Sequence, residues 1–74
     1  MLEQLQEIVR QFTGDAGLVL TGGTVLRTDL GLNSYELVEL VCKVEDAFDV
    51  EIPDRAISGL KTVQHVLDFL AAHA

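Results

Sequence analysis

The sequence predicts a small all-α fold, a bundle of three helices and one short helix around a single aliphatic core. The chain has 74 residues, of which 49% are hydrophobic, and such a composition is typical of a globular domain and not of a disordered segment. Apolar residues recur three and four positions apart over three stretches, which is the period of an amphipathic helix. Trp is absent and Phe occurs only three times, so the core must consist mainly of Leu, Val and Ile. We expect one domain over residues 1–74, with the marginal stability of a short chain.

The first helix is predicted over residues 2 to about 12. Its apolar positions recur at helical spacing, and they are Leu2, Leu5, Ile8, Val9 and Phe12. Polar residues fill the opposite side, so one stripe of the helix is buried. Gly14 follows as a left-handed cap that ends the helix.

Residues 14–33 lose the helical period, and the residues themselves leave two interpretations open. Two apolar runs, at residues 17–20 and 24–27, flank Thr21, Gly22 and Gly23, a pattern typical of a β-hairpin. A two-stranded hairpin alone is marginal in water, and the rest of the chain offers no third strand. We favour the alternative, a long loop that can contain a helical turn and whose Leu and Val side chains pack on the helical core.

The second helix is predicted over Ser34–Phe48. Asn33 is a good N-cap, and Glu36 three residues later completes a capping-box pattern. Five residues on one face form the core stripe: Leu37, Leu40, Val41, Val44 and Phe48. Pro53 then breaks the helical path.

The chain ends in a short helix and a longer one. Asp54 is expected to cap a short helical turn over residues 55–57, which Gly59 closes. Thr62 is expected to cap the last helix. The inner stripe of that helix is Val63, Val66, Leu67 and Leu70, with Phe69 at its edge.

The side of the second helix that faces away from the core carries an apolar strip framed by carboxylates. Its apolar members are Tyr35, Val38 and Cys42, and the acidic residues beside or between them are Glu39, Glu45, Asp46 and Asp49. One interpretation is an ordinary solvated face, since single apolar residues are common on surfaces. The other is a docking surface, on which apolar contacts supply affinity and the acidic frame attracts basic partners. The clustering on one face favours docking.

Ser34 begins the second helix, where the helix dipole and free backbone N–H groups favour an attached or bound phosphate. An ordinary serine in a capping region has the same position. A nucleophilic hydrolase is disfavoured, because such a serine needs a base and an orienting acid, and the only histidines, His65 and His73, lie in the last helix. Gly22 and Gly23 lack the spacing of a phosphate-binding loop.

The net charge of -7 limits the classes of partner. It disfavours nucleic acid and anionic membranes, because binding phosphates requires clustered Lys and Arg. It favours proteins with basic docking patches. The single Cys42 cannot form an internal disulfide, which suits a reducing compartment, and no apolar run is long enough to span a membrane. We therefore expect a cytoplasmic protein.

A motif and its surroundings resemble a known family. The run Asp29-Leu30-Gly31-Leu32-Asn33-Ser34 is followed at matching distances by an acidic helix that includes Glu39-Leu40 and Phe48, by Ile52-Pro53-Asp54, and by Thr62-Val63 before an aliphatic helix. Together these features strongly resemble the acyl carrier proteins. The resemblance covers nearly the whole chain, most firmly residues 29–70.

The resemblance implies a carrier and not an enzyme, with a four-helix architecture in which residues 14–33 form a loop and the third helix is short. It implies that Ser34 receives the 4'-phosphopantetheine group of coenzyme A through a phosphodiester, by the action of a separate transferase that holds Mg²⁺. The thiol of this arm then carries acyl groups as thioesters. Asp29, Leu30 and Gly31 match the run that precedes the attachment serine, and no metal site is implied on the chain.

The resemblance also assigns the exposed strip to partner binding. Acidic positions that match the family's contacts with basic patches, on the phosphopantetheinyl transferase and on acyl-processing enzymes, are Glu39, Glu45 and Asp46. Val38 and Cys42 match the apolar contacts between them. We expect a monomer, no chemical role for the Cys42 thiol, and an aliphatic core able to open around an acyl chain.

Two departures from the commonest form of the family concern the pathway. Asn33 stands where Asp is usual, and Tyr35 stands where Leu or Met is usual. Asn caps a helix as well as Asp does, so the fold is unaffected. Both residues lie where partner enzymes contact the carrier. The pathway therefore stays open among fatty acid, other lipid, polyketide and amino-acyl or peptidyl chemistry, and a carrier-like module that is never modified is a further alternative.

Overall fold

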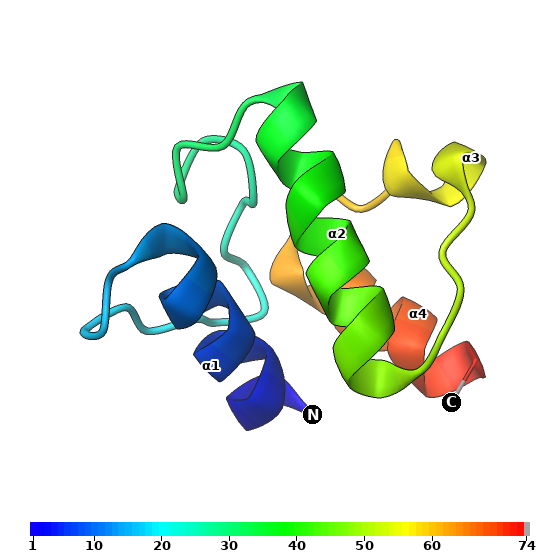
Figure 1. The fold of residues 1–74 in the computed structure, drawn as a ribbon, viewed down its shortest axis with the longest axis horizontal. Coiled ribbons are helices and arrows are strands. Elements are labelled where there is room, and N and C mark those ends of the chain that lie inside the picture. Colours follow the sequence, from blue (N-terminus) through cyan, green and yellow to red (C-terminus); the bar gives the residue numbers. More distant parts are fainter. Residues whose placement is uncertain (74) are drawn as a thin grey trace.

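A computed structural model describes residues 1–73 and has four helices. They are α1 (Leu2–Thr13), α2 (Ser34–Phe48), α3 (Asp54–Ile57) and α4 (Val63–His73). Figure 1 shows α2 crossing in front of α4, with α1 on one side of α2 and α3 on the other. Within residues 1–73 the only β-type pairing is an isolated antiparallel bridge between Val25 and Thr62. The predicted all-α fold, its long loop and its short third helix are confirmed.

One aliphatic core joins α1, α2, α4 and the loop. Its most deeply buried side chains are Leu5, Val9, Val63 and Leu70. The predicted stripes of α1, α2 and α4 supply most of it, but Leu2, predicted in the α1 stripe, is exposed. Four further stripe residues are partly buried against the core: Ile8, Phe12, Phe48 and Leu67. Phe48 is only half-buried at the end of α2, because the helix stops there and Asp49 turns into a left-handed conformation at φ 53°. Phe48 therefore packs at the edge of the core stripe to which it was assigned, whereas the assignment of Leu2 to the buried stripe was wrong, because Leu2 lies in the exposed first turn of α1.

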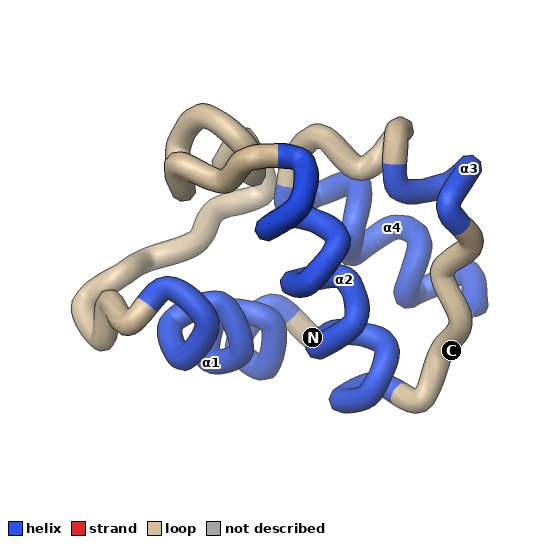
Figure 2. The backbone as a smooth tube through the Cα atoms, turned by 45° about the horizontal axis from the view of Figure 1, so that its top comes forward, coloured by secondary structure: helices blue, strands red, loops and turns tan. Residues whose placement is uncertain are grey.

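The loop of residues 14–33 lies against the start of α4 instead of folding into a hairpin (Figure 2). Three backbone hydrogen bonds make this pairing: Leu26 N–H to Lys61 O at 2.9 Å, Val63 N–H to Thr24 O at 2.9 Å, and Gln64 N–H to Gly22 O at 3.0 Å. The loop therefore pairs with a segment that is distant in sequence, whereas the hairpin interpretation paired two neighbouring segments of the loop with each other.

Side chains hold the first half of the loop on α1. Arg10 Nε donates to Leu18 O, and Gln6 Oε1 accepts from Leu20 N–H at 2.9 Å. Three leucines spaced six apart then enter the core, namely Leu20, Leu26 and Leu32. The burial of these three side chains stabilises the loop, which has no regular backbone hydrogen bonding of its own.

The second half of the loop is a compact turn that leads into α2. The Asp29 carboxylate accepts from Val25 N–H at 2.8 Å, and Asp29 N–H donates to Val25 O at 2.9 Å. Leu32 N–H donates to Arg27 O at 2.9 Å. Gly31 has φ 68°, a left-handed conformation that other residues adopt only with strain. The turn therefore depends on Asp29 and Gly31.

Local signals fix the ends of the helices, with one correction. Gly14 caps α1 at φ 75°, and Thr62 Oγ1 accepts from His65 N–H in the first turn of α4, both as predicted. Asp54 was expected to cap α3, but it is the first helical residue. Pro53 is the N-cap, because its φ of -67° suits extended backbone and its carbonyl accepts from Ala56 N–H at 2.9 Å.

A pair of truncations tests the described core. We expect Leu70→Ala, at a side chain with no exposed surface, to lower the free energy of unfolding by about 2–5 kcal/mol. Phe48→Ala should cost less than full burial of the ring would imply, since part of the ring is exposed. Urea unfolding followed by circular dichroism measures both. A loss for Phe48→Ala as large as full burial of the ring implies would contradict the burial described for the end of α2.

Gly31→Ala tests the turn before α2. We expect it to lower the free energy of unfolding by about 1–2 kcal/mol, because alanine is strained at positive φ. Gly23→Ala is the matched control: it lies in the same loop, does not have positive φ, and leaves open space for a methyl group, with no atom within 4 Å of it. Thermal unfolding of the two variants should differ, and equal stabilities would show that the turn tolerates a side chain at residue 31.

Candidate functional site

Ser34 is the first residue of α2, and its side chain is exposed. A capping box closes this end of the helix: Asn33 Oδ1 accepts from Glu36 N–H at 2.8 Å, and Glu36 Oε1 accepts from Asn33 N–H at 3.2 Å. The cap is thus made by the residues on either side, and the Ser34 hydroxyl takes no part in it. Since Leu32 and Leu37 are both buried at the positions of a hydrophobic staple, the direction in which the chain enters α2 is also fixed.

The start of α2 is electrostatically suited to an anion. The helix has 15 residues, and its dipole leaves partial positive charge at this end. The Asn33 side chain accepts a hydrogen bond from the Glu36 N–H, and the first intrahelical bond runs from Leu37 N–H to Asn33 O. The N–H groups of Ser34 and Tyr35 come before that bond and have no acceptor within the helix. A negative group on the Ser34 oxygen would therefore be stabilised.

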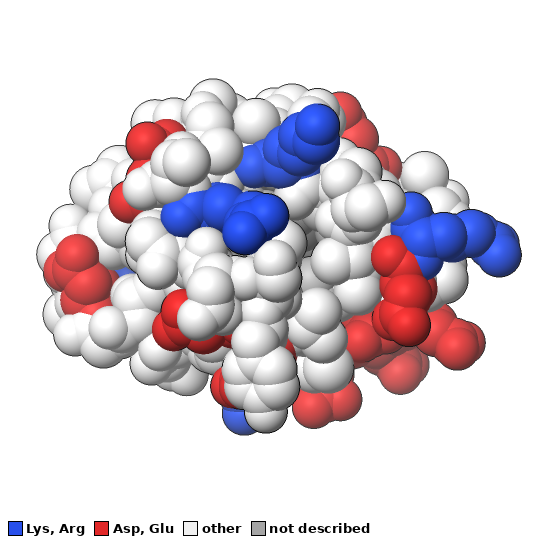
Figure 3. Space-filling model, turned by 90° about the horizontal axis from the view of Figure 1, so that it is seen from above, with Lys and Arg blue, Asp and Glu red and all other residues white. Residues whose placement is uncertain are grey.

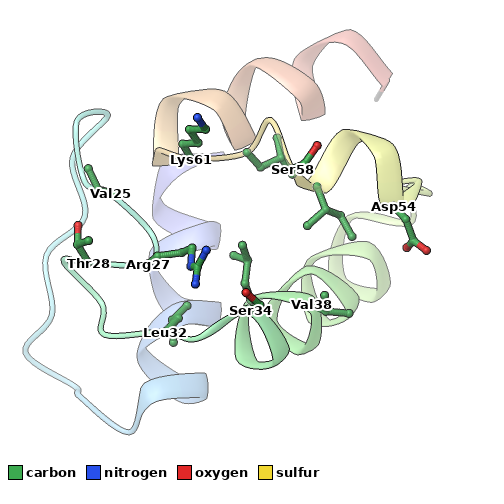
Figure 4. Close-up of a pocket in the computed structure, with 12 residues that line it drawn as sticks. Val25, Arg27, Thr28, Leu32, Ser34, Val38, Asp54, Ser58 and Lys61 are labelled. Carbon is green, nitrogen blue, oxygen red and sulfur yellow. The ribbon is translucent and has the colours of Figure 1, made fainter.

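Ser34 lies on the wall of an open groove of about 850 Å³ (Figure 4). The groove is bounded by the first turns of α2, by the loop before it and by the segment from α3 to α4. Its apolar lining is Val25, Leu32, Leu37, Val38, Ile57 and Leu60, and its polar lining is Arg27, Thr28, Ser34, Asp54, Ser58 and Lys61. The groove combines apolar walls with two basic residues.

The charges on the face seen from above are unevenly distributed. Figure 3 shows two basic side chains next to each other over the middle of this face, while acidic side chains gather toward its edges. Figure 4 labels Arg27 and Lys61 on two walls of the groove, across from Ser34. The surroundings of the serine are thus locally basic in a protein of net charge -7.

The core between the helices is closed. The void enclosed there has a volume of about 10 Å³, with Val9, Leu40 and Val66 among its lining residues. A space of that size holds about one water molecule. An acyl chain would need the helices to separate, whereas in this conformation the groove beside Ser34 is an apolar space that a ligand can reach.

Five of the seven predicted strip residues are exposed within α2, and Asp49 is exposed at its C-cap. The exposed ones are Tyr35, Val38, Glu39, Cys42 and Asp46, with Tyr35 74% and Val38 44% accessible. Glu45 differs. It is half-buried, and its Oε2 accepts from Ile52 N–H at 2.8 Å, so this carboxylate ties the chain after α2 to the helix.

The residues predicted to precede the attachment serine shape the loop. The Asp29 carboxylate bonds to Val25 N–H, Leu30 is half-buried against the core, and Gly31 supplies the left-handed turn. None of the three is among the residues that line the groove. Their physical contribution is to set the position of Asn33 and Ser34.

Sequence reasoning missed Arg27 and Lys61 as neighbours of the serine. They lie far apart in the chain, and the pairing of Leu26 with Lys61 brings them to the same groove. No local pattern signals such a pairing. Ser58 and Leu60 were missed for the same reason.

Neither a metal centre nor a membrane span occurs in the described part of the chain. Within residues 1–73, no three His, Cys, Asp or Glu side chains are arranged to hold a metal ion. No helix in the same range has the length and apolar character needed to cross a membrane.

Comparison with known proteins places the chain in a family. Residues 3–70 match the family model described as "Phosphopantetheine attachment site". The chain is 37% identical over 71 residues to an acyl carrier protein of Syntrophobacter fumaroxidans, covering 96% of this chain and 88% of that protein. It is 34% identical over 73 residues to an acyl carrier protein of Cyanidioschyzon merolae, covering 99% and 80%.

Solved structures have the same fold. A putative acyl carrier protein from Mycobacterium tuberculosis superposes with a TM-score of 0.87 at 30% identity, covering 96% of this chain and 95% of that one. The acyl carrier protein from Enterococcus faecalis superposes with a TM-score of 0.75 at 24% identity, covering 97% and 95%, and this second likeness concerns the fold alone. On the family match and the identities over nearly the full length, the chain belongs to the acyl carrier proteins, which carry a covalently attached 4'-phosphopantetheine.

Proposed function

We propose that Ser34 is the residue to which 4'-phosphopantetheine is attached, and that the protein carries acyl groups as thioesters on this arm. The observation that carries the proposal is an exposed hydroxyl on the first residue of a firmly capped helix, on the wall of the apolar groove. The serine oxygen forms the new bond to phosphorus and displaces the adenosine bisphosphate part of coenzyme A, and the hydroxyl proton passes to a base on the transferase. The arm supplies a thiol for thioester formation.

The residues present fit this group. The phosphodiester would lie at the N-terminus of α2, where a negative charge gains about 0.3–1 kcal/mol from the dipole. Because the cap is formed by Asn33 and Glu36, modification of Ser34 leaves the bonds that hold the helix start intact. The attachment point is therefore rigid while the arm remains free to move.

The surroundings of Ser34 support a carrier and not a catalyst. His65 uses Nδ1 to accept from the N–H groups of Lys61 and Thr62, and His73 stacks on Phe69. Neither histidine lines the groove. A hydrolytic serine would need a base within hydrogen-bond reach, and the lining residues offer none.

The exposed strip of α2 is the proposed docking surface for the transferase and for acyl-processing enzymes. Tyr35, Val38 and Cys42 offer apolar contacts, and Glu39 and Asp46 offer charges to basic patches. Glu45 is better suited to hold Ile52 in place than to contact a partner. The protein is proposed to act as a cytoplasmic monomer, and the exposed thiol of Cys42 suits a reducing compartment.

The proposed pathway is fatty acid biosynthesis or a related lipid or polyketide pathway, with amino-acyl or peptidyl cargo as the alternative. Tyr35 favours a specialised set of partners, because its ring is 74% exposed directly beside the serine. The same ring motivates a second candidate, a module that binds partners and is never modified. The two candidates differ in whether the Ser34 oxygen receives the arm.

Attachment is tested by intact mass. Purified protein is incubated with coenzyme A, Mg²⁺ and a phosphopantetheinyl transferase of broad specificity, and we expect a mass increase of one phosphopantetheine group. Ser34→Ala should abolish the increase. Ser58→Ala is the matched control, because Ser58 lines the same groove but donates its hydroxyl hydrogen to Arg55 O.

Three results decide between the candidates. Modification that survives Ser34→Ala would place the arm elsewhere on the chain. An unmodified wild-type protein, also when purified from its native host, would favour the interaction module. Loss of modification in Ser58→Ala would show that the transferase depends on the groove wall and not on the serine oxygen alone.

Charge reversal tests the docking strip. Glu39→Lys or Asp46→Lys should raise the Kd for the transferase by up to about fivefold at low salt, with a smaller effect at high salt. Glu7→Lys on α1 has the same change of charge on another exposed surface and should leave the Kd nearly unchanged. Titration calorimetry at two salt concentrations measures this, and equal effects of Glu7→Lys and Glu39→Lys would mean that only net charge matters.

A further inference from the structure

Two basic residues line the groove beside Ser34. The protein has five Lys and Arg residues against twelve Asp and Glu residues, yet Arg27 and Lys61 both line this groove. Both side chains are exposed. Asp54 is the acidic residue of the lining, and Figure 4 shows its carboxylate directed away from the two cations.

The backbone fixes the two cations as neighbours. Leu26, the residue before Arg27, donates its N–H to Lys61 O at 2.9 Å, and Val25 is bridged to Thr62. Arg27 O accepts from Leu32 N–H, so the segment that carries the guanidinium is held at both ends of the turn.

The rest of the groove is apolar. Leu32 and Leu37 belong to the core and line one part of it, while Ile57 and Leu60 line the part toward α3. A ligand that fits therefore has an apolar stretch and an anionic end. Other surfaces of this acidic protein would repel that end, because the net charge is -7.

We infer that the groove receives an acyl group that ends in a carboxylate, with its methylene chain on the apolar walls and its carboxylate bound by Arg27 and Lys61. The inference rests on the proposed attachment at Ser34, which tethers the acyl group at the groove wall. Arg27 can bind a carboxylate through two parallel N–H donors, and Lys61 adds a third charge-assisted bond. An acyl group with a methyl end would occupy the same walls but leave both cations without a counter-charge.

The test compares two acyl groups of equal length on the full chain. The phosphopantetheine groups of coenzyme A and of its hexanoyl and adipoyl thioesters are transferred to the Ser34 oxygen with release of adenosine bisphosphate, and intact mass verifies each adduct. Hexanoyl ends in a methyl group and adipoyl in a carboxylate. Failure to form any adduct would overturn the proposed attachment at Ser34. It would not bear on acyl binding in the groove, because the acyl groups are compared only after they have been attached.

On the loaded proteins, cleavage of the thioester by hydroxylamine reports how well the groove covers the acyl group. We expect adipoyl to be cleaved about threefold more slowly than hexanoyl, as two exposed charge contacts allow. The double variant Arg27→Gln with Lys61→Gln should remove this difference, and so should high salt. Arg55→Gln, which removes a cation outside the groove, should retain it. Shifts of the Arg27 Nε–H signal in NMR spectra should accompany adipoyl and be absent with hexanoyl.

Several outcomes would overturn the inference. One is equal cleavage of the two acyl groups in the wild type. A second is a difference that persists in the double variant or disappears in Arg55→Gln. A third is a shift of the Arg27 signal that is already complete on the arm without an acyl group, because the cations would then bind the phosphodiester.

Discussion

The pairing of loop residues 22–26 with the start of α4 is the constraint on which the rest of the structure depends. Three backbone hydrogen bonds, made by Leu26, Val63 and Gln64, close a loop that has no regular structure of its own. The closure brings Leu20 and Leu26 into the core and places the turn around Asp29 where it can deliver the chain to α2. Without it, the groove would lose two of its three walls. The functional surface of this small helical protein is therefore built by its longest irregular segment.

A second, independent constraint holds Ser34. The capping box of Asn33 and Glu36 and the burial of Leu32 and Leu37 fix the first turn of α2 from both sides. These interactions are local in sequence, whereas the loop pairing is not. The position of Ser34 is thus held by this local cap as well as by the turn at Asp29 and Gly31, while the composition of the groove around it depends on the loop almost entirely.

This division explains what could be predicted from the sequence. Helix limits, the cap at Asn33 and the exposed strip follow from short-range spacing, and the structure has them within a residue or two. The predictions for Leu2 and Asp54 were wrong because helix ends are decided by tertiary geometry: Leu2 lies in the exposed first turn of α1, and Pro53 takes the capping position of α3. The groove could not be predicted from the sequence. Arg27 and Lys61 become neighbours only through the backbone pairing of the loop with the start of α4, and the spacing of residues in the sequence does not indicate that pairing. Glu45 shows the same limit, because its partner, Ile52 N–H, lies beyond the helix.

The two proposed surfaces meet at one side chain. Val38 is 44% exposed on the strip of α2 and also lines the groove beside Ser34. A partner that docks on the strip therefore contacts a residue on which the acyl group would lie. The partner and the acyl group cannot both contact the same apolar surface of Val38, so they compete for it. Each contact that the partner makes with Val38 therefore lowers the free energy needed to release the acyl group from the groove. The acyl group is then either bound in the groove and protected, or released from it and available to an enzyme. Docking of the partner shifts the equilibrium toward the released state.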